Sequence, residues 1–404
     1  MKHTLLLVVV GDLDVGGTER HLVQVLPKLS PERYRAVVYT LTHKGALAPR
    51  LEAAGIPVIA PPGSGLLRRR PGRLGRHMLL LAVSIPTLLL LMMRERPAVV
   101  HLFLPRPYII GGLCAVLTRR PVRIMSRRSL NIYQQKYPYA GRIERWLHRR
   151  MQAILGNSAA VVAELRAEGA PPERLGLLYN GIDLAPYEDH VGGARAELGI
   201  PDDALVLVIV ANLIAYKGHA DLIEALGKVR GDLPAGWVLL CVGGDDGPGD
   251  DLKARAAALE IDGNVRWLGE RADVPALLAS ADIGLLCSHQ EGFANSILEG
   301  MAAGLPMIVT EVGGNSEAVI DGITGLVVSP RDPRAFGEAL LALACDPERR
   351  RAMGAAGRRR VAETFPLDAC VARYERLYDA LTANDARPVA EMIAGRSRST
   401  THRG

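Results

Sequence analysis

Short apolar runs alternate with helix-length amphipathic segments along the chain, in two successive series. Apolar runs of strand length separated by helices are typical of parallel sheets covered on both faces. A length of 404 residues accommodates two such domains. We therefore predict an α/β protein with two doubly wound domains. The expected strands lie at 4–10, 36–41, 58–60, 99–104, 122–125 and 153–155, then at 205–210, 237–242, 265–268, 283–287 and 307–309.

The link between the two series, residues 183–193, is rich in glycine, proline and acidic residues. We expect an N-terminal domain at 1–185 and a C-terminal domain at 186–365. An amphipathic helix is expected from about 366 to 385, followed by a flexible tail at 386–404. The five cysteines follow no paired spacing, and the first ten residues form a strand-like run without a cleavage site. Free thiols and the lack of a leader predict a cytoplasmic protein.

Charge is distributed unequally between the two halves. Residues 1–185 carry 27 Lys and Arg against 11 Asp and Glu, a formal net charge of +16. Residues 186–404 carry 22 against 32, a net charge of −10. A cationic domain attracts lipid headgroups, phosphorylated substrates or nucleic acid, but its arginine clusters lack interleaved aromatics, so nucleic acid is not expected. The alternative is a solvated basic surface, which leaves the opposite charge of the second half unexplained.

Residues 78–93 contain no charged side chain and are rich in leucine. The segment is short for a membrane span, and Pro86 interrupts it. Two interpretations stay open. One is a helix packed against the sheet. The other is a helix seated at a membrane interface, which the flanking arginines favour (Arg73, Arg76, Arg94 and Arg96).

The segment EGFANSILEG, residues 291–300, follows an expected strand and places two glutamates around a helix start. Ligands of open α/β sheets bind beyond the carboxyl ends of strands. Asn295 and Ser296 are residue types that begin helices. Glu291 is therefore expected on the loop before the helix, and Glu299 about one turn inside it.

A helix N-terminus attracts a phosphate, and a carboxylate accepts hydrogen bonds from sugar hydroxyls. The pattern therefore suits a nucleotide sugar, in which two sugars flank a diphosphate. From spacing alone the alternative is structural: Glu299 caps or salt-bridges its own helix, and Glu291 is a surface acid.

Several segments resemble, in order, motifs of the glycosyltransferase family four enzymes. The resemblance covers residues 6 to about 381. It implies the GT-B fold, with two Rossmann-like domains facing across a cleft and a C-terminal helix returning to the first domain. It also implies a retaining transfer from a nucleotide-diphosphate sugar, without a metal or another cofactor. The segments are VGGTERHLVQVL, LLYNGID, NLIAYKGHADLI, NVRWLGERADVPALLASADIGLLCS and EGFANSILEGMAAGLPMIVTEVGGNSEAVIDGITGLVV.

The resemblance assigns roles to residues of the second domain by position. Glu299 matches the acid that holds the nucleotide ribose, and Glu291 matches the acid that contacts the transferred sugar. Lys217 matches a lysine that pairs with the diphosphate, and Arg271 matches the region that reads the nucleobase. The backbone expected to face the sugar and the diphosphate belongs to Gly292, Phe293, Ala294 and Asn295.

Two departures from the family pattern concern catalysis. Asn212 stands where the family often has a donor-binding arginine, and the text SRRSLN replaces a histidine after the fifth strand. Arg127 is our candidate for a catalytic cation of the first domain, with Ser129 beside it. Arg128 and Arg20 are the alternatives for the missing positive charge.

The first domain contributes a glycine loop. Gly16 and Gly17 match the family's loop that closes on the phosphate from the other domain. The preceding Asp12-Leu13-Asp14 reads DxD, which binds a metal in a different glycosyltransferase architecture. This three-residue pattern is common by chance, and no metal is expected. His101, within AVVHLFL, is either a core histidine or a cleft residue, and we favour the cleft.

These observations predict a retaining glycosyltransferase, with the donor on the second domain and the acceptor on the first. The positive first domain indicates an anionic or lipid-linked glycan acceptor, as in cell-envelope or exopolysaccharide synthesis. It also indicates a peripheral position on the inner face of the plasma membrane. Two alternatives stay open, a catalytically silent nucleotide-sugar-binding subunit and a sugar-nucleotide epimerase of GT-B fold.

Overall fold

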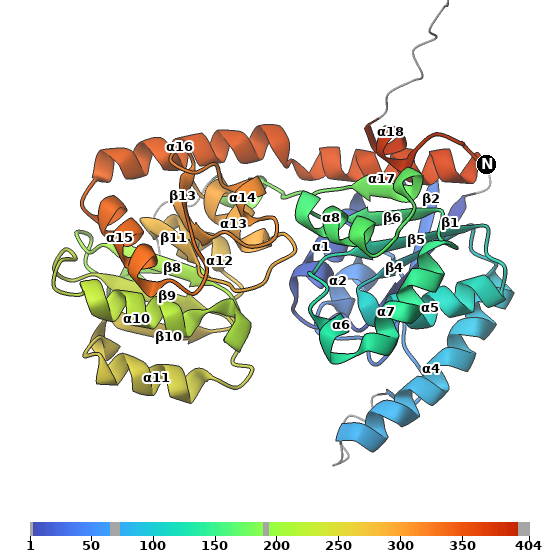
Figure 1. Cartoon of the computed structure of the whole chain (residues 1–404), viewed down its shortest axis with the longest axis horizontal. Helices are drawn as coiled ribbons and strands as arrows, with labels where there is room; N and C mark the ends of the chain where they lie inside the picture. The colour runs from blue at the N-terminus through green and yellow to red at the C-terminus, as the bar shows by residue number, and fades with distance from the viewer. Residues whose placement is uncertain (1–2, 65–72, 189–193, 395–404) are drawn as a thin grey trace, which may run out of the picture. The chain divides into compact units, whose positions relative to one another are not determined.

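The computed structural model describes residues 3–64, 73–188 and 194–394. The chain forms two compact units. Unit 1 combines Met1–Gly181 with Leu367–Gly404, and unit 2 is Ile182–Pro366. Each unit is built around one parallel sheet with helices on both faces (Figure 1).

The sheet of unit 1 has seven strands in the order β3-β2-β1-β4-β5-β6-β7. Its central strand β1 is a nearly continuous run of Leu and Val, as expected for a strand buried on both faces. In β1, Leu6 and Val8 enter one core, whereas Leu7 and Val9 enter the other. The strands are β1 (Thr4–Val10), β2 (Tyr34–Thr40), β3 (Val58–Ile59), β4 (Val99–Phe103), β5 (Val122–Arg127), β6 (Ala153–Gly156) and β7 (Leu175–Leu177).

Helices cover this sheet on its two faces. One core packs under α1 (Gly17–Val25) and α17 (Leu367–Thr382), and the other packs under α4 (Arg73–Glu95), α5 (Pro105–Leu117) and α8 (Ala159–Ala167). The remaining helices of unit 1 are η1 (Leu26–Lys28), α2 (Ala48–Ala53), α6 (Tyr133–Lys136), α7 (Pro138–His148), η2 (Pro172–Arg174) and α18 (Val389–Ala394).

The sheet of unit 2 has six strands in the order β10-β9-β8-β11-β12-β13. They are β8 (Val206–Val210), β9 (Val238–Val242), β10 (Val265–Gly269), β11 (Ile283–Leu286), β12 (Met307–Thr310) and β13 (Gly325–Val328). The helices are η3 (Ala185–Tyr187), α9 (Ala194–Glu197), η4 (Ala215–Lys217), α10 (His219–Val229), α11 (Gly249–Ala258), η5 (Asp262–Asn264), α12 (Val274–Ala279), α13 (Asn295–Ala302), α14 (Asn315–Ala318), α15 (Pro333–Ala344) and α16 (Pro347–Thr364).

The C-terminal segment belongs to unit 1. Tyr374, Leu377 and Tyr378 of α17 are buried in the same core as strand β1. His101 is part of this core as well, because its Nδ1 is 2.9 Å from the Tyr378 hydroxyl and its Nε2 is 2.8 Å from Ser126 Oγ. Burial, followed by the charge of Arg128, lowers the pKa of His101 to about 3. The preference for a cleft position of His101 is therefore wrong.

The expected tail from residue 386 is wrong over part of its length. Residues 389–394 form helix α18, whose Val389, Met392 and Ile393 are buried in the core of unit 1. Residues 395–404 lie outside the described part of the chain. Of the predicted link at 183–193, residues 189–193 also lie outside it.

The leucine-rich segment 78–93 lies in α4, a helix with an internal Pro86. Leu88 and Met92 are buried against the sheet, whereas Leu90 and Met93 are exposed. Within the described ranges, none of the helices combines the length and the apolar character that a membrane span needs.

Helix α17 should be integral to the stability of unit 1. Leu377 is fully buried, so Leu377→Ala should lower the free energy of unfolding by about 3 kcal/mol through lost packing. The control is Asp368→Ala on the same helix, whose side chain is 86% exposed and forms a surface ion pair with Lys28. Urea denaturation measures both, and equal stability of the two variants would contradict this prediction.

Candidate active site

Helix α13 begins where the sequence predicts. Strand β11 ends at Leu286, and α13 runs from Asn295 to Ala302. Its N-cap residue is Ala294, in an extended conformation, which provides no side-chain cap to the first helical amides. Glu291 accordingly lies on the loop before the helix, and Glu299 is the fifth helical residue.

Glu291 and Lys217 form an ion pair at this loop. Lys217 Nζ lies 2.5 Å from Glu291 Oε1, and Ser288 Oγ donates to the same oxygen over 2.7 Å. The side chains of Lys217 and Glu291 are 19% and 10% exposed. Although burial alone would lower the pKa of Lys217, the Glu291 carboxylate raises it above its ordinary value. The loop therefore holds a charged ammonium and a carboxylate side by side.

Two glycines with positive φ permit this arrangement. Gly218 (φ 73°) follows Lys217, and an added Cβ would lie 1.9 Å from the carbonyl oxygen of Cys287. Gly313 (φ 53°) follows β12, and an added Cβ would lie 1.9 Å from the carbonyl oxygen of Glu291. Gly314 N also donates to Gly292 O over 2.9 Å. The loops after β8, β11 and β12 are thus packed backbone against backbone.

The other predicted residues of this segment are largely buried. Phe293, Ala294 and Glu299 are 5%, 7% and 9% exposed. Phe293 packs its ring against Phe365, with 5.4 Å between the ring centroids. Phe293 therefore has a structural role in unit 2, in addition to its predicted place at the donor.

Asn212 and Arg271 lie on other loops of unit 2. Asn212 follows β8, and its Oδ1 accepts from Gly244 N over 3.1 Å. Arg271 follows β10 and forms ion pairs with Asp273 at 2.6 Å and Glu197 at 3.0 Å. Because all strands are parallel, these loops share the carboxyl edge of the sheet with Glu291. The described contacts bring Lys217 and Glu291 together, and they give Asn212 and Arg271 separate partners.

The glycine loop of unit 1 precedes α1. Gly16 is its N-cap and Gly17 its first residue. An added Cβ on Gly16 would lie 2.3 Å from Glu19 Oε2, so the glycine makes room for this carboxyl group. Burial, together with the carboxylates of Asp12 and Asp14 and against the charge of Arg128, raises the pKa of Glu19 to about 7.

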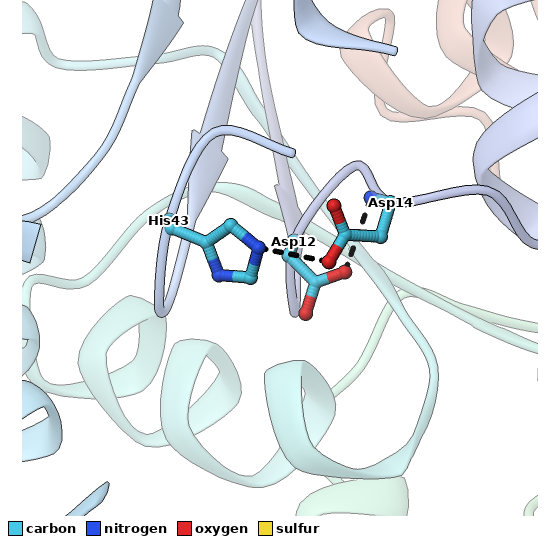
Figure 2. A group of neighbouring side chains, drawn as sticks. All are labelled: Asp12, Asp14 and His43. Carbon is cyan, nitrogen blue, oxygen red and sulfur yellow. Dashed lines mark hydrogen bonds and ion pairs between the residues drawn. The ribbon is translucent and has the colours of Figure 1, made fainter. Parts of the chain in front are cut away.

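Asp12, Asp14 and His43 form a polar group beside this loop (Figure 2). His43 Nε2 lies 2.8 Å from Asp14 Oδ2, and Asp14 N donates to Asp12 Oδ1 over 3.2 Å. One ligand atom of each residue lies within 4.8 Å of the others. Hydrogen bonds account for these distances.

Sequence reasoning did not single out Ser288, Glu19 or the two positive-φ glycines. Ser288 directly follows β11 and Cys287, which is where strand-end ligands of α/β sheets are found. Gly218 follows the short helix η4, and Gly313 lies shortly after the polar end of β12; both are loop positions at which glycine adopts a positive φ. Glu19 carries no signal of its own, because its burial depends on its neighbours.

Two protein-family models match the chain one after the other. The model described as "Glycosyltransferase Family 4" matches residues 15–186, and "Glycosyl transferases group 1" matches residues 193–360. The chain belongs to glycosyltransferase family 4. The resemblance inferred from its motifs is thereby confirmed.

Curated relatives of this family 4 protein include one named as a synthase and two named as glycosyltransferases. N-acetyl-alpha-D-glucosaminyl L-malate synthase of Bacillus anthracis is 31% identical over 223 residues, which are 55% of this chain and 58% of the relative. D-inositol 3-phosphate glycosyltransferase of Streptomyces scabiei is 27% identical over 409 residues, 94% of this chain and 89% of the relative. The enzyme of that name from Corynebacterium glutamicum is 33% identical over 227 residues, 54% of each chain. The matches thus span little more than half of two of these relatives.

Two solved structures share the fold. Anabaena Alr3699/HepE in complex with UDP-glucose has a TM-score of 0.80 at 22% identity, covering 94% of this chain and all of that one. WaaG, a glycosyltransferase involved in lipopolysaccharide biosynthesis, has a TM-score of 0.71 at 20% identity, covering 90% and 98%. The predicted GT-B fold class, with two parallel-sheet α/β units, is confirmed.

Arg127 does not suit the catalytic role predicted for it in this family 4 protein. Its side chain is 2% exposed and forms ion pairs with Glu144 at 2.7 Å and with Glu168. Although burial alone would lower the pKa of Arg127, the two carboxylates raise it, and the pKa of Glu168 is lowered to about 2. A guanidinium neutralised inside unit 1 cannot act on a substrate, so we withdraw Arg127 from the catalytic set.

The raised pKa of Glu19 predicts a pH-dependent stability. Its folded-state pKa of about 7 exceeds the ordinary value of 4.5, so ionising Glu19 destabilises the folded state as the pH rises through this interval. Glu19→Gln removes the ionisation. Its stability relative to the parent should therefore increase by about 3 kcal/mol between pH 4 and pH 8. Urea denaturation of both proteins at the two pH values measures this, and a pH-independent difference would contradict the burial of Glu19.

Proposed function

We propose that this chain is a retaining glycosyltransferase that moves a sugar from a nucleotide-diphosphate sugar to an acceptor. The observation that carries the proposal is the Lys217–Glu291 ion pair on the loop before α13. Family membership and the relatives named D-inositol 3-phosphate glycosyltransferase support it.

The chemistry follows from charge. When the glycosidic bond to a nucleoside diphosphate breaks, negative charge grows on the diphosphate and positive charge on the sugar. Lys217 and the amides at the start of α13 would stabilise the diphosphate, and the Glu291 carboxylate would lie near the cationic sugar. Glu299, one turn into α13, would accept hydrogen bonds from the ribose hydroxyls.

The proposed transfer uses no metal and no cofactor. The ammonium of Lys217 provides positive charge that a metal ion supplies in other phosphate sites. Uridine nucleotides are the first donors to screen, because the Anabaena neighbour was solved with UDP and with UDP-glucose.

Hydrolysis of a nucleotide sugar in the absence of acceptor tests the proposal. Lys217→Ala and Glu291→Gln should each lower the rate of nucleoside diphosphate release by about 100-fold to 1,000-fold, because each removes a preorganised charge. Lys228→Ala is the matched control, since Lys228 is half exposed on α10 and forms a surface ion pair with Glu224. A chelator should leave the rate unchanged.

Three results would contradict parts of this proposal. Equal rates in all variants would exclude the ion pair from the reaction. Binding of the nucleotide sugar without any turnover would favour the silent subunit, and an epimerised donor sugar would favour the epimerase.

We further propose that the acceptor is anionic or membrane-borne, as in the synthesis of cell-envelope polysaccharide or glycolipid. The names of the relatives include acceptors with a phosphate or a carboxylate, D-inositol 3-phosphate and L-malate. The net charge of +16 over residues 1–185 supports an anionic partner for unit 1.

An apolar and cationic face of unit 1 supports membrane association. Helices α4 and α5 pack side by side (Figure 1), and Leu90, Met93 and Leu117 are 65%, 62% and 72% exposed on them. A hollow at this face is lined by Leu89, Met93, Arg96, Leu117, Thr118 and Arg120. Exposed apolar side chains between arginines fit the interface of an anionic lipid layer.

Vesicle sedimentation tests this membrane association. The full chain should bind vesicles with about 30% phosphatidylglycerol more tightly than phosphatidylcholine vesicles, and added salt should weaken the binding. The double variant Leu90→Ser, Leu117→Ser should lose most of it. The control is Ile320→Ser with Ile323→Ser, which removes two exposed apolar side chains of unit 2. Equal loss in both double variants, or salt-insensitive binding, would count against the α4–α5 face.

A further inference from the structure

Two consecutive arginines at the end of β5 lie in opposite environments. Arg127, the last residue of the strand, is neutralised by Glu144 and Glu168. Arg128 follows it, and successive side chains of an extended chain point to opposite faces. Arg128 faces the core beneath α17 and α1, and it is 9% exposed.

The polar partners of Arg128 are neutral. Its Nη2 donates to Asn180 Oδ1 over 2.6 Å, and the Tyr374 hydroxyl is its second hydrogen-bonding neighbour. In the part of the chain that the structure describes, no carboxylate forms an ion pair with Arg128. A buried guanidinium without a counter-ion is costly, and burial lowers the pKa of Arg128.

The titratable groups around Arg128 leave its charge largely uncompensated. Burial, followed by the charge of Arg128, holds the pKa of His21 well below its ordinary value and lowers that of His101 to about 3. Both rings are therefore neutral at pH 7. The nearby acid is Glu19, which is only partly ionised at this pH because its pKa is about 7.

The position of Arg128 is one at which ligands bind. It follows the carboxyl end of β5, and the carboxyl ends of parallel strands form the ligand edge of open α/β sheets. Its electrostatic neighbour Glu19 lies in the first turn of α1, whose N-cap Gly16 gives no side-chain cap. A buried ring nitrogen of a neighbouring residue, His21 Nδ1, has no hydrogen-bond partner among the described residues.

We propose that Arg128 binds an anionic group, a phosphate or a carboxylate, on a ligand held by unit 1. In the reaction proposed above this ligand is the acceptor, and that part of the inference rests on the proposed function. A guanidinium fits both groups, because its planar fork can donate two parallel hydrogen bonds to either.

Thermal stability of the full chain with added anions tests this site. The parent for the test is Lys217→Ala, so that the proposed phosphate contact in unit 2 is removed. Inorganic phosphate and malate are added separately at constant ionic strength, and they distinguish a phosphate site from a carboxylate site. At least one anion should raise the melting temperature of the parent. Adding Arg128→Gln should weaken the apparent affinity for that anion by about tenfold or more.

The controls keep the outcome interpretable. Arg50→Gln removes an exposed arginine of α2 in the same unit and should leave the anion-dependent shift unchanged. Arg128→Lys preserves the positive charge but lacks the planar guanidinium that donates two parallel hydrogen bonds. The affinity of this variant for the anion should therefore lie between those of the parent and Arg128→Gln. If Arg128→Gln does not fold, the comparison of Arg128→Lys with the parent tests the proposal.

Three results would overturn the proposal. They are the lack of a shift in the parent with either anion, an equal shift in Arg128→Gln, and an affinity of Arg128→Lys equal to that of the parent. None of these measurements needs turnover, so they are independent of whether the chain hydrolyses a nucleotide sugar.

Discussion

The ion pair between Lys217 and Glu291 joins the segments that follow strands β8 and β11 of unit 2, and the rest of the candidate site depends on it. Two partly desolvated charges are stable there because each neutralises the other and Ser288 adds a hydrogen bond. Their approach requires the close backbone packing at Gly218 and Gly313. The same contacts fix the loop that leads into α13, so the helix amides and the two charges are positioned by one arrangement.

Much of the fold could be predicted because buried parallel strands such as β1 and β8 are mainly apolar runs in the amino-acid sequence. The strand expected at 4–10 coincides with β1, and the start of α13 and the places of Glu291 and Glu299 relative to it agree with the structure. These features are local, because a buried strand, its polar end and the following helix start each produce a pattern within a short stretch of sequence.

The missed features depend on contacts between distant segments. Strand β7 is only three residues long, and α18 follows a polar stretch, so neither has a clear pattern of its own. They pack on each other: an added Cβ on Gly176 would lie 2.6 Å from Ile393 and 2.7 Å from Val389. Similarly, the sequence could not predict the different environments of Arg127 and Arg128, because the partners of these two arginines come from other segments of the chain.

The discontinuity of unit 1 has a consequence for the order of events at the ribosome. Unit 2 is one continuous stretch, whereas the core of unit 1 needs α17 and α18, which are made after unit 2. Domains generally fold as units during synthesis. The part of the protein that is translated before unit 2 is therefore completed after it. While nearly two hundred residues of unit 2 are added, the core face of unit 1 that α17 and α18 will pack against is covered only in part, by α1 and α2.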